Sequence, residues 1–171
     1  SGSMRPQMEK TIEQLQLLAM FCKKANIPFD CFAFSNMWDR FKQEPLGYER
    51  NTLQLNDFRL LHLISSKVKM NEFNKSMAYL TYMKAGFAWG SYDVPSLPHN
   101  LHLGGTPLNE AIITAADMVA PFKKMHGLQI VNVVFLTDGA GHRIQSYNGA
   151  DGQQHGFRSR NAYVTDPISK K

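Results

Sequence analysis

Hydroxyl and carboxylate side chains occur in three short segments that are far apart in the sequence. The segments are Ser1-Gly2-Ser3-Met4, Gly104-Gly105-Thr106-Pro107 and Leu136-Thr137-Asp138-Gly139. Oxygen ligands of these types suit a hard divalent cation such as Mg²⁺. We therefore expect Ser1, Ser3, Thr106 and Asp138 to form one metal site that holds Mg²⁺, with Mn²⁺ or Ca²⁺ as alternatives.

The local context of these residues favours one common site. Asp138 directly follows an apolar, β-branched run, residues 129–136, which predicts a strand. Thr106 is a good N-cap for a helix over residues 106–126, and Pro107 fits its first position. Ser1 and Ser3 precede a predicted helix. In an open parallel sheet, ligands bind at the carboxyl ends of the strands, where such loops meet.

The elements that must position these residues follow from hydrophobic periodicity and from end signals. Helices are predicted over residues 5–25, 72–86 and 106–126, and strands over 28–34, 59–64 and 129–136. This order predicts an α/β fold of three layers, with a mainly parallel sheet and helices on both faces. Asn26 and Gly127 are the expected helix ends.

Each predicted helix carries one apolar stripe that predicts its buried face. The stripes are Met8, Ile12, Leu15, Ala19 and Cys22 in the first helix, Phe73, Met77, Leu80 and Met83 in the second, and Leu108, Ala111, Ile112, Ala115 and Val119 in the third. We expect a short helix over 37–42, loops over 87–103 and 139–162, and a short strand over 162–165. The whole chain, 1–171, is predicted to be one domain, with its core in 1–140 and a loop-rich extension in 141–171.

Composition excludes several classes of protein. A hydrophobic content of 43% with 19% charged residues is typical of a globular chain. The net charge of +5 comes from scattered lysines and arginines, which indicates a solvated surface and no nucleic-acid partner. No apolar stretch is long enough to span a bilayer, so no membrane partner is expected. Cys22 and Cys31 lack CxxC spacing and sit in apolar runs, which favours reduced thiols and a cytoplasmic protein.

The three segments together resemble the von Willebrand factor A (vWA) domain and its metal-ion-dependent adhesion site. The helix after Ser1-Gly2-Ser3-Met4 and the strand Pro28-Phe29-Asp30-Cys31-Phe32-Ala33-Phe34 look like that family's first helix and following strand. Gly105-Thr106-Pro107 and Thr137-Asp138-Gly139 look like its second and third metal loops. The most similar types are the A domain of the cobaltochelatase large subunit and related bacteriophage-encoded proteins. The resemblance covers roughly residues 1–140.

The resemblance implies a role for each predicted ligand. Ser1 and Ser3 would bind the cation through hydroxyls, Thr106 would bind when a ligand is present, and Asp138 would bind directly or through water. The family's pattern starts with Asp-x before the two serines, and this pair has no counterpart here. The first central strand is also missing, so we expect a vWA fold that is incomplete at both ends and belongs to a longer polypeptide.

The function implied by the resemblance is metal-dependent protein binding without intrinsic catalysis. One coordination position would be left for water or for an acidic side chain of a partner protein. That partner would be an AAA+ ATPase of the MoxR or chelatase kind, with the vWA domain as adaptor or co-subunit.

Several alternatives stay open. Ser1-Met4 could be a cloning remnant that precedes an initiator Met4. A cobaltochelatase-like enzyme subunit could use His99, His102, His142 or His155 on a tetrapyrrole, although no zinc-ligand spacing supports a metal role for them. A metal-free structural component of a phage assembly is the third possibility.

Two further residues are expected to have structural roles. Glu110 is expected to interact favourably with the positive end of its helix, and His62 is expected to be a packed core residue.

Overall fold

The computed structural model describes residues 5–36, 58–87, 103–137, 139, 141, 146–148 and 154–156. The chain divides into two compact units. One unit comprises Ser1–Trp38 and Asp57–His142, and the other comprises Asp39–Asn56 and Arg143–Lys171. The first unit contains α1 (Arg5–Lys24), β1 (Asp30–Ser35), β2 (Arg59–Ser65), α2 (Met70–Phe87) and α3 (Leu108–His126). The second contains β3 (Ser146–Asn148) and β4 (Gln154–Gly156). The described fold is therefore mixed α and β.

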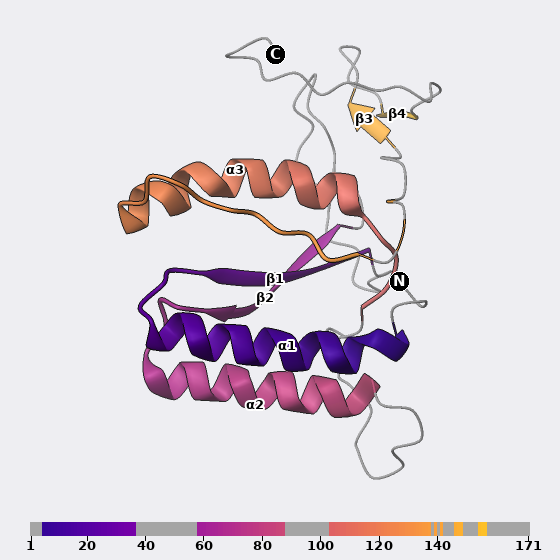
Figure 1. The fold of residues 1–171 in the computed structure, drawn as a ribbon. Coiled ribbons are helices and arrows are strands. Elements are labelled where there is room, and N and C mark those ends of the chain that lie inside the picture. Colours follow the sequence, from indigo (N-terminus) through magenta and orange to yellow (C-terminus); the bar gives the residue numbers. More distant parts are fainter. Residues whose placement is uncertain are drawn as a thin grey trace. The chain divides into compact units, whose positions relative to one another are not determined.

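The core of the first unit lies where α1 and α2 pack against the β1–β2 pair (Figure 1). Its fully buried side chains are Ile12, Ala19, Ile64, Phe73, Leu80 and Met83, with Met8, Leu15 and Met77 packed around them. The Gln16 amide also donates to the Met77 carbonyl at 3.1 Å and to the Thr81 hydroxyl at 2.9 Å, which joins α1 to α2. The predicted apolar stripes of α1 and α2 are thus confirmed.

Both predicted helix ends are confirmed by left-handed residues. Asn26 has φ 55°, and the Ile27 N–H donates to the Cys22 carbonyl at 2.9 Å. Gly127 has φ 62°, and the Leu128 N–H donates to the Lys123 carbonyl at 3.0 Å. These bonds are those of a Schellman motif, which satisfies carbonyls that the last helical turn leaves without partners.

The sheet of the first unit differs from the mainly parallel sheet that was predicted. β1 pairs with β2 in antiparallel register, from Asp30 opposite Ser65 to Ser35 opposite Arg59, with an irregularity between Cys31 and Phe32. β1 and β2 are the only strands described in this unit, and no parallel pair occurs among the described residues. Figure 1 shows α1 and α2 on one side of this pair and α3 on the other.

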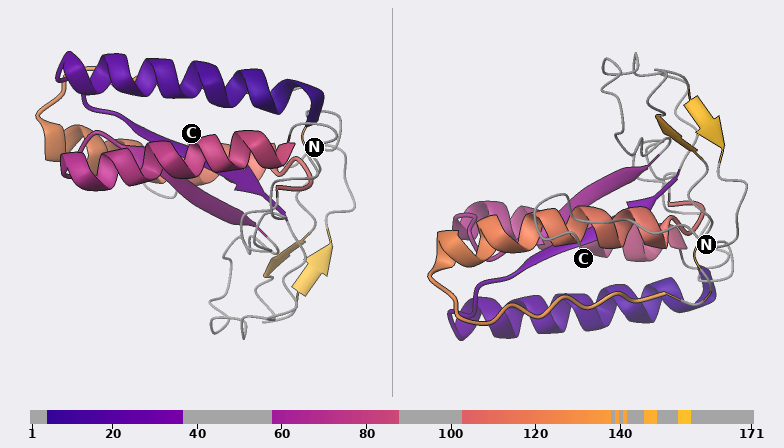
Figure 2. Two further views of the ribbon diagram at one scale, coloured as in Figure 1. Left: turned by 90° about the horizontal axis from the view of Figure 1, so that it is seen from below. Right: turned by 90° about the horizontal axis from the view of Figure 1, so that it is seen from above.

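No strand forms over residues 129–136, so that prediction is wrong for this structure. After Gly127 the chain runs back along α3 as an extended trace without ladder pairing (Figures 1 and 2). We call residues 128–137 the return segment. An apolar, β-branched sequence favours extended backbone, but a strand also needs a partner edge at hydrogen-bonding distance. The return segment has no such partner within the described part of the chain.

The second unit contains an antiparallel pair where the sequence predicted only loop. β3 pairs with β4 through Ser146 opposite Gly156, Tyr147 opposite His155, and Asn148 opposite Gln154. The predicted short helix over 37–42, the strand over 162–165 and most of the predicted loop over 87–103 lie outside the described residues. Among the helices that are described, none has the length and apolar character that a membrane crossing requires.

Candidate functional site

The second predicted metal loop, residues 104–107, is hydrogen-bonded to the carboxyl end of β1. The Ser35 hydroxyl donates to the Gly104 carbonyl at 2.9 Å and accepts from the Gly104 N–H at 2.8 Å. The Asn36 N–H also donates to the Gly104 carbonyl, at 3.1 Å. Ser35 is fully buried, so loss of the two part-buried bonds to Gly104 would leave its hydroxyl without partners, which is costly. The loop is thereby held at the carboxyl end of β1.

Gly105 allows this close approach. Its φ is 62°, and a Cβ atom built on it would overlap the Asn36 Oδ1. Both conditions require glycine, because other residues adopt a left-handed backbone only at a cost and carry the Cβ that would collide. Gly105 therefore lets the loop backbone come close to Asn36.

Thr106 does not cap α3, contrary to the prediction. The helix begins at Leu108, its N-cap position is Pro107, and no side chain donates or accepts a capping hydrogen bond there. The Leu108 N–H instead donates to the Thr106 carbonyl at 2.8 Å. With Pro107 at φ −78° and ψ 63°, this is an inverse γ-turn. Proline fixes its own φ but not its ψ, so the helix starts only after the turn.

Two buried side-chain oxygen atoms near this turn accept no hydrogen bond from the described residues. Thr106 is 8% exposed and Glu110, on the first turn of α3, is 7% exposed. Within the described part of the chain, the Glu110 Oε2 and the Asn36 Oδ1 are buried without a hydrogen-bond partner. An oxygen acceptor buried in this way lacks the donor or cation that would offset its desolvation. This polar environment is the chemistry that a cation site needs, and hydroxyl and carboxylate oxygens are suitable donors for Mg²⁺.

Of the four predicted metal ligands, the structure places only Thr106. Ser1, Ser3 and Asp138 lie outside the described residues, so their convergence with Thr106 stays a prediction. Among the residues that are described, no group of three or more His, Cys, Asp or Glu side chains could hold a metal ion. The predicted set is not such a group, because it has three hydroxyls and one carboxylate.

Ser35 and Asn36 were not among the residues predicted to have a functional role. The available signal was their position directly after a strand, where site residues of α/β proteins often lie. The structure does not test the histidines proposed for the alternative tetrapyrrole enzyme. His99, His102 and His142 lie outside the described residues, and only the backbone of His155 is described, in β4.

The sequence predicted that His62 is a packed core residue, and this prediction is wrong. Its side chain is 49% exposed, its Nε2 lies 3.2 Å from the Asp30 Oδ1, and its ring stacks on Phe32 with centroids 4.5 Å apart. His62 has a solvent-facing position in β2, between the half-buried Leu61 and Leu63.

The two cysteines are free thiols, as predicted. Burial and, to a smaller extent, the neighbouring Asp30 carboxylate together raise the pKa of Cys31 to about 11. A thiol with this pKa stays protonated at neutral pH, and it is therefore a poor nucleophile and a poor metal ligand.

The comparisons with known proteins give no family for this chain. No family model matches it, no curated protein is significantly similar to it, and no solved structure matches its fold. The vWA resemblance therefore rests on the residues quoted for it.

Proposed function

We propose that this protein is a divalent-metal-dependent protein-binding domain of the vWA type. One observation carries the proposal. The Gly-Gly-Thr loop is fixed by hydrogen bonds to the carboxyl end of β1, beside buried oxygens that have no donor among the described residues. This is where a metal loop of such a domain would have to lie.

The proposed ligands are the hydroxyls of Ser1, Ser3 and Thr106 and the carboxylate of Asp138. They would hold Mg²⁺, or Mn²⁺ or Ca²⁺ in its place, and leave one position for an acidic side chain of a partner. The cation would supply a fixed positive charge that attracts a carboxylate. The inverse γ-turn supports the assignment of Thr106, because its side chain makes no helix-capping hydrogen bond.

The finer features of the fold and the partner also belong to this proposal. We propose that the domain has three layers around a mainly parallel sheet, and that the antiparallel β1–β2 pair is one edge of it. An AAA+ ATPase of the MoxR or chelatase kind is the proposed partner, by resemblance alone. A cytoplasmic location is proposed because Cys22 and Cys31 are unpaired thiols.

Metal titration of three matched proteins tests the site. Wild type, Thr106→Ala and Thr106→Ser would be titrated with MgCl₂ and MnCl₂ by isothermal calorimetry. Loss of the hydroxyl is expected to weaken binding about tenfold or more, comparable to losses at other metal sites. Serine keeps the hydroxyl and should bind nearly as wild type does. For the wild type, Mg²⁺ at about 100 times its Kd should add about 2.7 kcal/mol to the free energy of unfolding.

Two results would count against the proposal. The first is a wild type that binds neither cation, and the second is a Thr106→Ala protein that binds as tightly as wild type. The thermal midpoints of all three proteins in EDTA serve as the folding control. If the binding site exists, association with a candidate AAA+ ATPase should be lost in EDTA and should return when Mg²⁺ is added in excess.

A further inference from the structure

Lysines that are scattered in the sequence meet at one end of the first unit. Three segments come together there: the end of α1 with the turn to β1, the loop between β2 and α2, and the end of α3 (Figure 1). The Lys23 ammonium joins the first two segments, because it donates to the Ser66 and Val68 carbonyls at 2.5 and 2.8 Å. The Lys67 Nζ lies 3.1 Å from the Met125 Sδ, which joins the loop to α3. These contacts form one surface at the amino end of β1, and the candidate metal site lies at its carboxyl end.

Positive charge dominates this surface. Segments 20–30, 65–72 and 122–128 hold two carboxylates, no arginine and six lysines: Lys23, Lys24, Lys67, Lys69, Lys123 and Lys124. Most of the net charge of +5 is therefore concentrated here. All of these lysines except Lys23 are exposed, and within the described part of the chain none forms an ion pair with a carboxylate. Unpaired like charges repel one another, and a negatively charged partner would offset this repulsion.

The helix ends account for only some of these lysines. Those in the last turns of α1 and α3 interact favourably with the negative ends of the helix dipoles. Lys69 differs, because its carbonyl accepts from the Phe73 N–H at the start of α2, so its charge lies at the positive end of that helix. The Lys67 ammonium contacts a thioether, which is a weak acceptor. The described fold therefore gives neither loop lysine a strong partner, which favours a role in binding.

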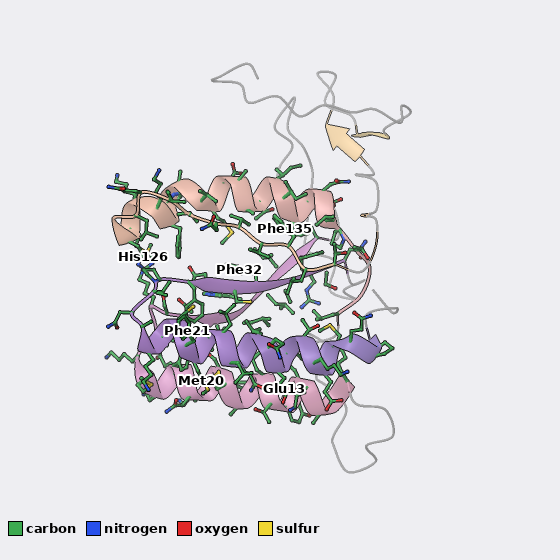
Figure 3. The ribbon with its side chains drawn as sticks, viewed as in Figure 1. Glu13, Met20, Phe21, Phe32, His126 and Phe135 are labelled. Atoms are coloured by element: carbon green, nitrogen blue, oxygen red, sulfur yellow. The ribbon has the colours of Figure 1, made fainter. Side chains whose placement is uncertain are left out.

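Exposed apolar side chains lie among the lysines. They come from every segment that meets here and are between 45% and 63% exposed: Phe21, Ile27, Met70 and Met125. Figure 3 shows Phe21 of α1 and His126 of α3 at the same end of the unit. Apolar side chains surrounded by charged ones are typical of a surface that binds another protein.

We propose that this surface binds an acidic segment of a partner protein that also carries apolar side chains. We call the five exposed lysines and the four exposed apolar residues the basic end. Carboxylates of the partner would pair with the lysines, and its apolar side chains would cover the apolar residues between them. Methionine side chains such as Met70 and Met125 are unbranched and adapt to the shape of a partner, which suits peptide binding. This interaction does not depend on the proposed metal site.

The chemistry of the basic end favours a protein over a nucleic acid or a membrane. Arginine is the preferred residue for phosphate recognition, because its planar guanidinium binds two oxygens, and these segments contain none. A phosphate backbone would also leave the apolar residues without partners. A helix that lies in a membrane surface carries its apolar residues along one face, whereas here they come from α1, α2, α3 and a turn.

Peptide binding by matched charge-reversal variants tests the proposal. The probe is a fluorescent peptide rich in glutamate and aspartate with interspersed leucines, and its anisotropy would be measured in EDTA, which removes any contribution of the metal site. Reversal of two basic-end charges, Lys67→Glu with Lys124→Glu, is expected to weaken binding about tenfold or more. The control reverses two charges elsewhere, Lys10→Glu in the first half of α1 with Lys84→Glu in the last turn of α2, and should bind as the wild type does.

Two further measurements test which features of the partner are recognised. A peptide in which glutamine and asparagine replace the acidic residues should not bind. Phe21→Ser should weaken binding of the acidic peptide, whereas Tyr79→Ser, which changes an equally exposed residue on α2, should not. Thermal midpoints verify that each variant folds, and the neutral pair Lys67→Gln with Lys124→Gln replaces the charge reversal if that variant does not fold.

The proposal is wrong if the wild type does not bind the acidic peptide, or if the basic-end variant binds it as tightly as the wild type does. Tighter binding of duplex DNA or of phosphatidylserine vesicles, lost in the same variant, would assign the surface to another class of partner and would also overturn the proposal. The outcome is independent of the metal site, because Thr106→Ala should bind the peptide as the wild type does and the basic-end variant should still bind Mg²⁺.

Discussion

At the scale of single residues, the candidate site depends on side chains that are small or absent. Gly105 brings the loop backbone against Asn36, and Ser35 fastens it through one hydroxyl that both donates and accepts. The sequence suggested the role of the glycine, because Gly-Gly before a Thr-Pro helix start is a local pattern. The partner of the loop could not be predicted, because Ser35 is 69 residues away from Gly104 and only the fold brings them together.

Gly105→Ala should destabilise the first unit more than Gly127→Ala does. Both glycines have φ 62°, so alanine at either position meets a left-handed backbone cost of about 1–2 kcal/mol. Only at Gly105 would the new Cβ also overlap Asn36, since nothing lies within 4 Å of the Gly127 position. Urea unfolding of the two variants would measure the difference in the free energy of unfolding. Equal losses would mean that the loop does not approach Asn36 as closely as described.

At the scale of elements, the stability of the described fold is concentrated in α1, α2 and the β1–β2 pair. Leu80 is 1% exposed, and it joins this core from α2. α3 differs, because Glu110 and Ala111 of its first turn are the residues that it buries. Its predicted stripe is only partly covered, and Ile112 is exposed. Among the described residues, the apolar face of α3 is therefore less completely covered than those of α1 and α2.

Leu80→Ala should cost about 2–5 kcal/mol, because it removes a buried side chain and leaves a cavity between α1, α2 and the strands. Tyr79→Ala, at the next position of the same helix, removes an exposed side chain and should change the free energy of unfolding by about 0.5 kcal/mol or less. Chemical denaturation with matched m-values would measure both. A loss at Leu80 no larger than that at Tyr79 would mean that α2 packs through a different face.

At the scale of the whole molecule, the helices could be predicted and the pairing of strands could not. A helix closes its hydrogen bonds within itself, so periodicity and end residues such as Asn26 and Gly127 identified α1, α2 and most of α3. A strand depends on a partner that is remote in sequence. The run over 129–136 had the composition of a buried strand and has no strand partner among the described residues, while Ser146–Asn148 and Gln154–Gly156 paired without a strong apolar signal. Asn-Gly and Asp-Gly occur between those two strands and were the available turn signal.

The lack of a strand partner for 129–136 predicts how fast the amides of this segment exchange with solvent. In dilute protein the amides of 129–136 have no acceptor within the described chain and should exchange rapidly, whereas those of β1, α1 and α2 should be protected. Mass spectrometry of proteolytic peptides from the wild-type protein would measure the exchange of both groups of amides. Protection of 129–136 as strong as that of β1 would mean that these amides have hydrogen-bond acceptors and would contradict the prediction.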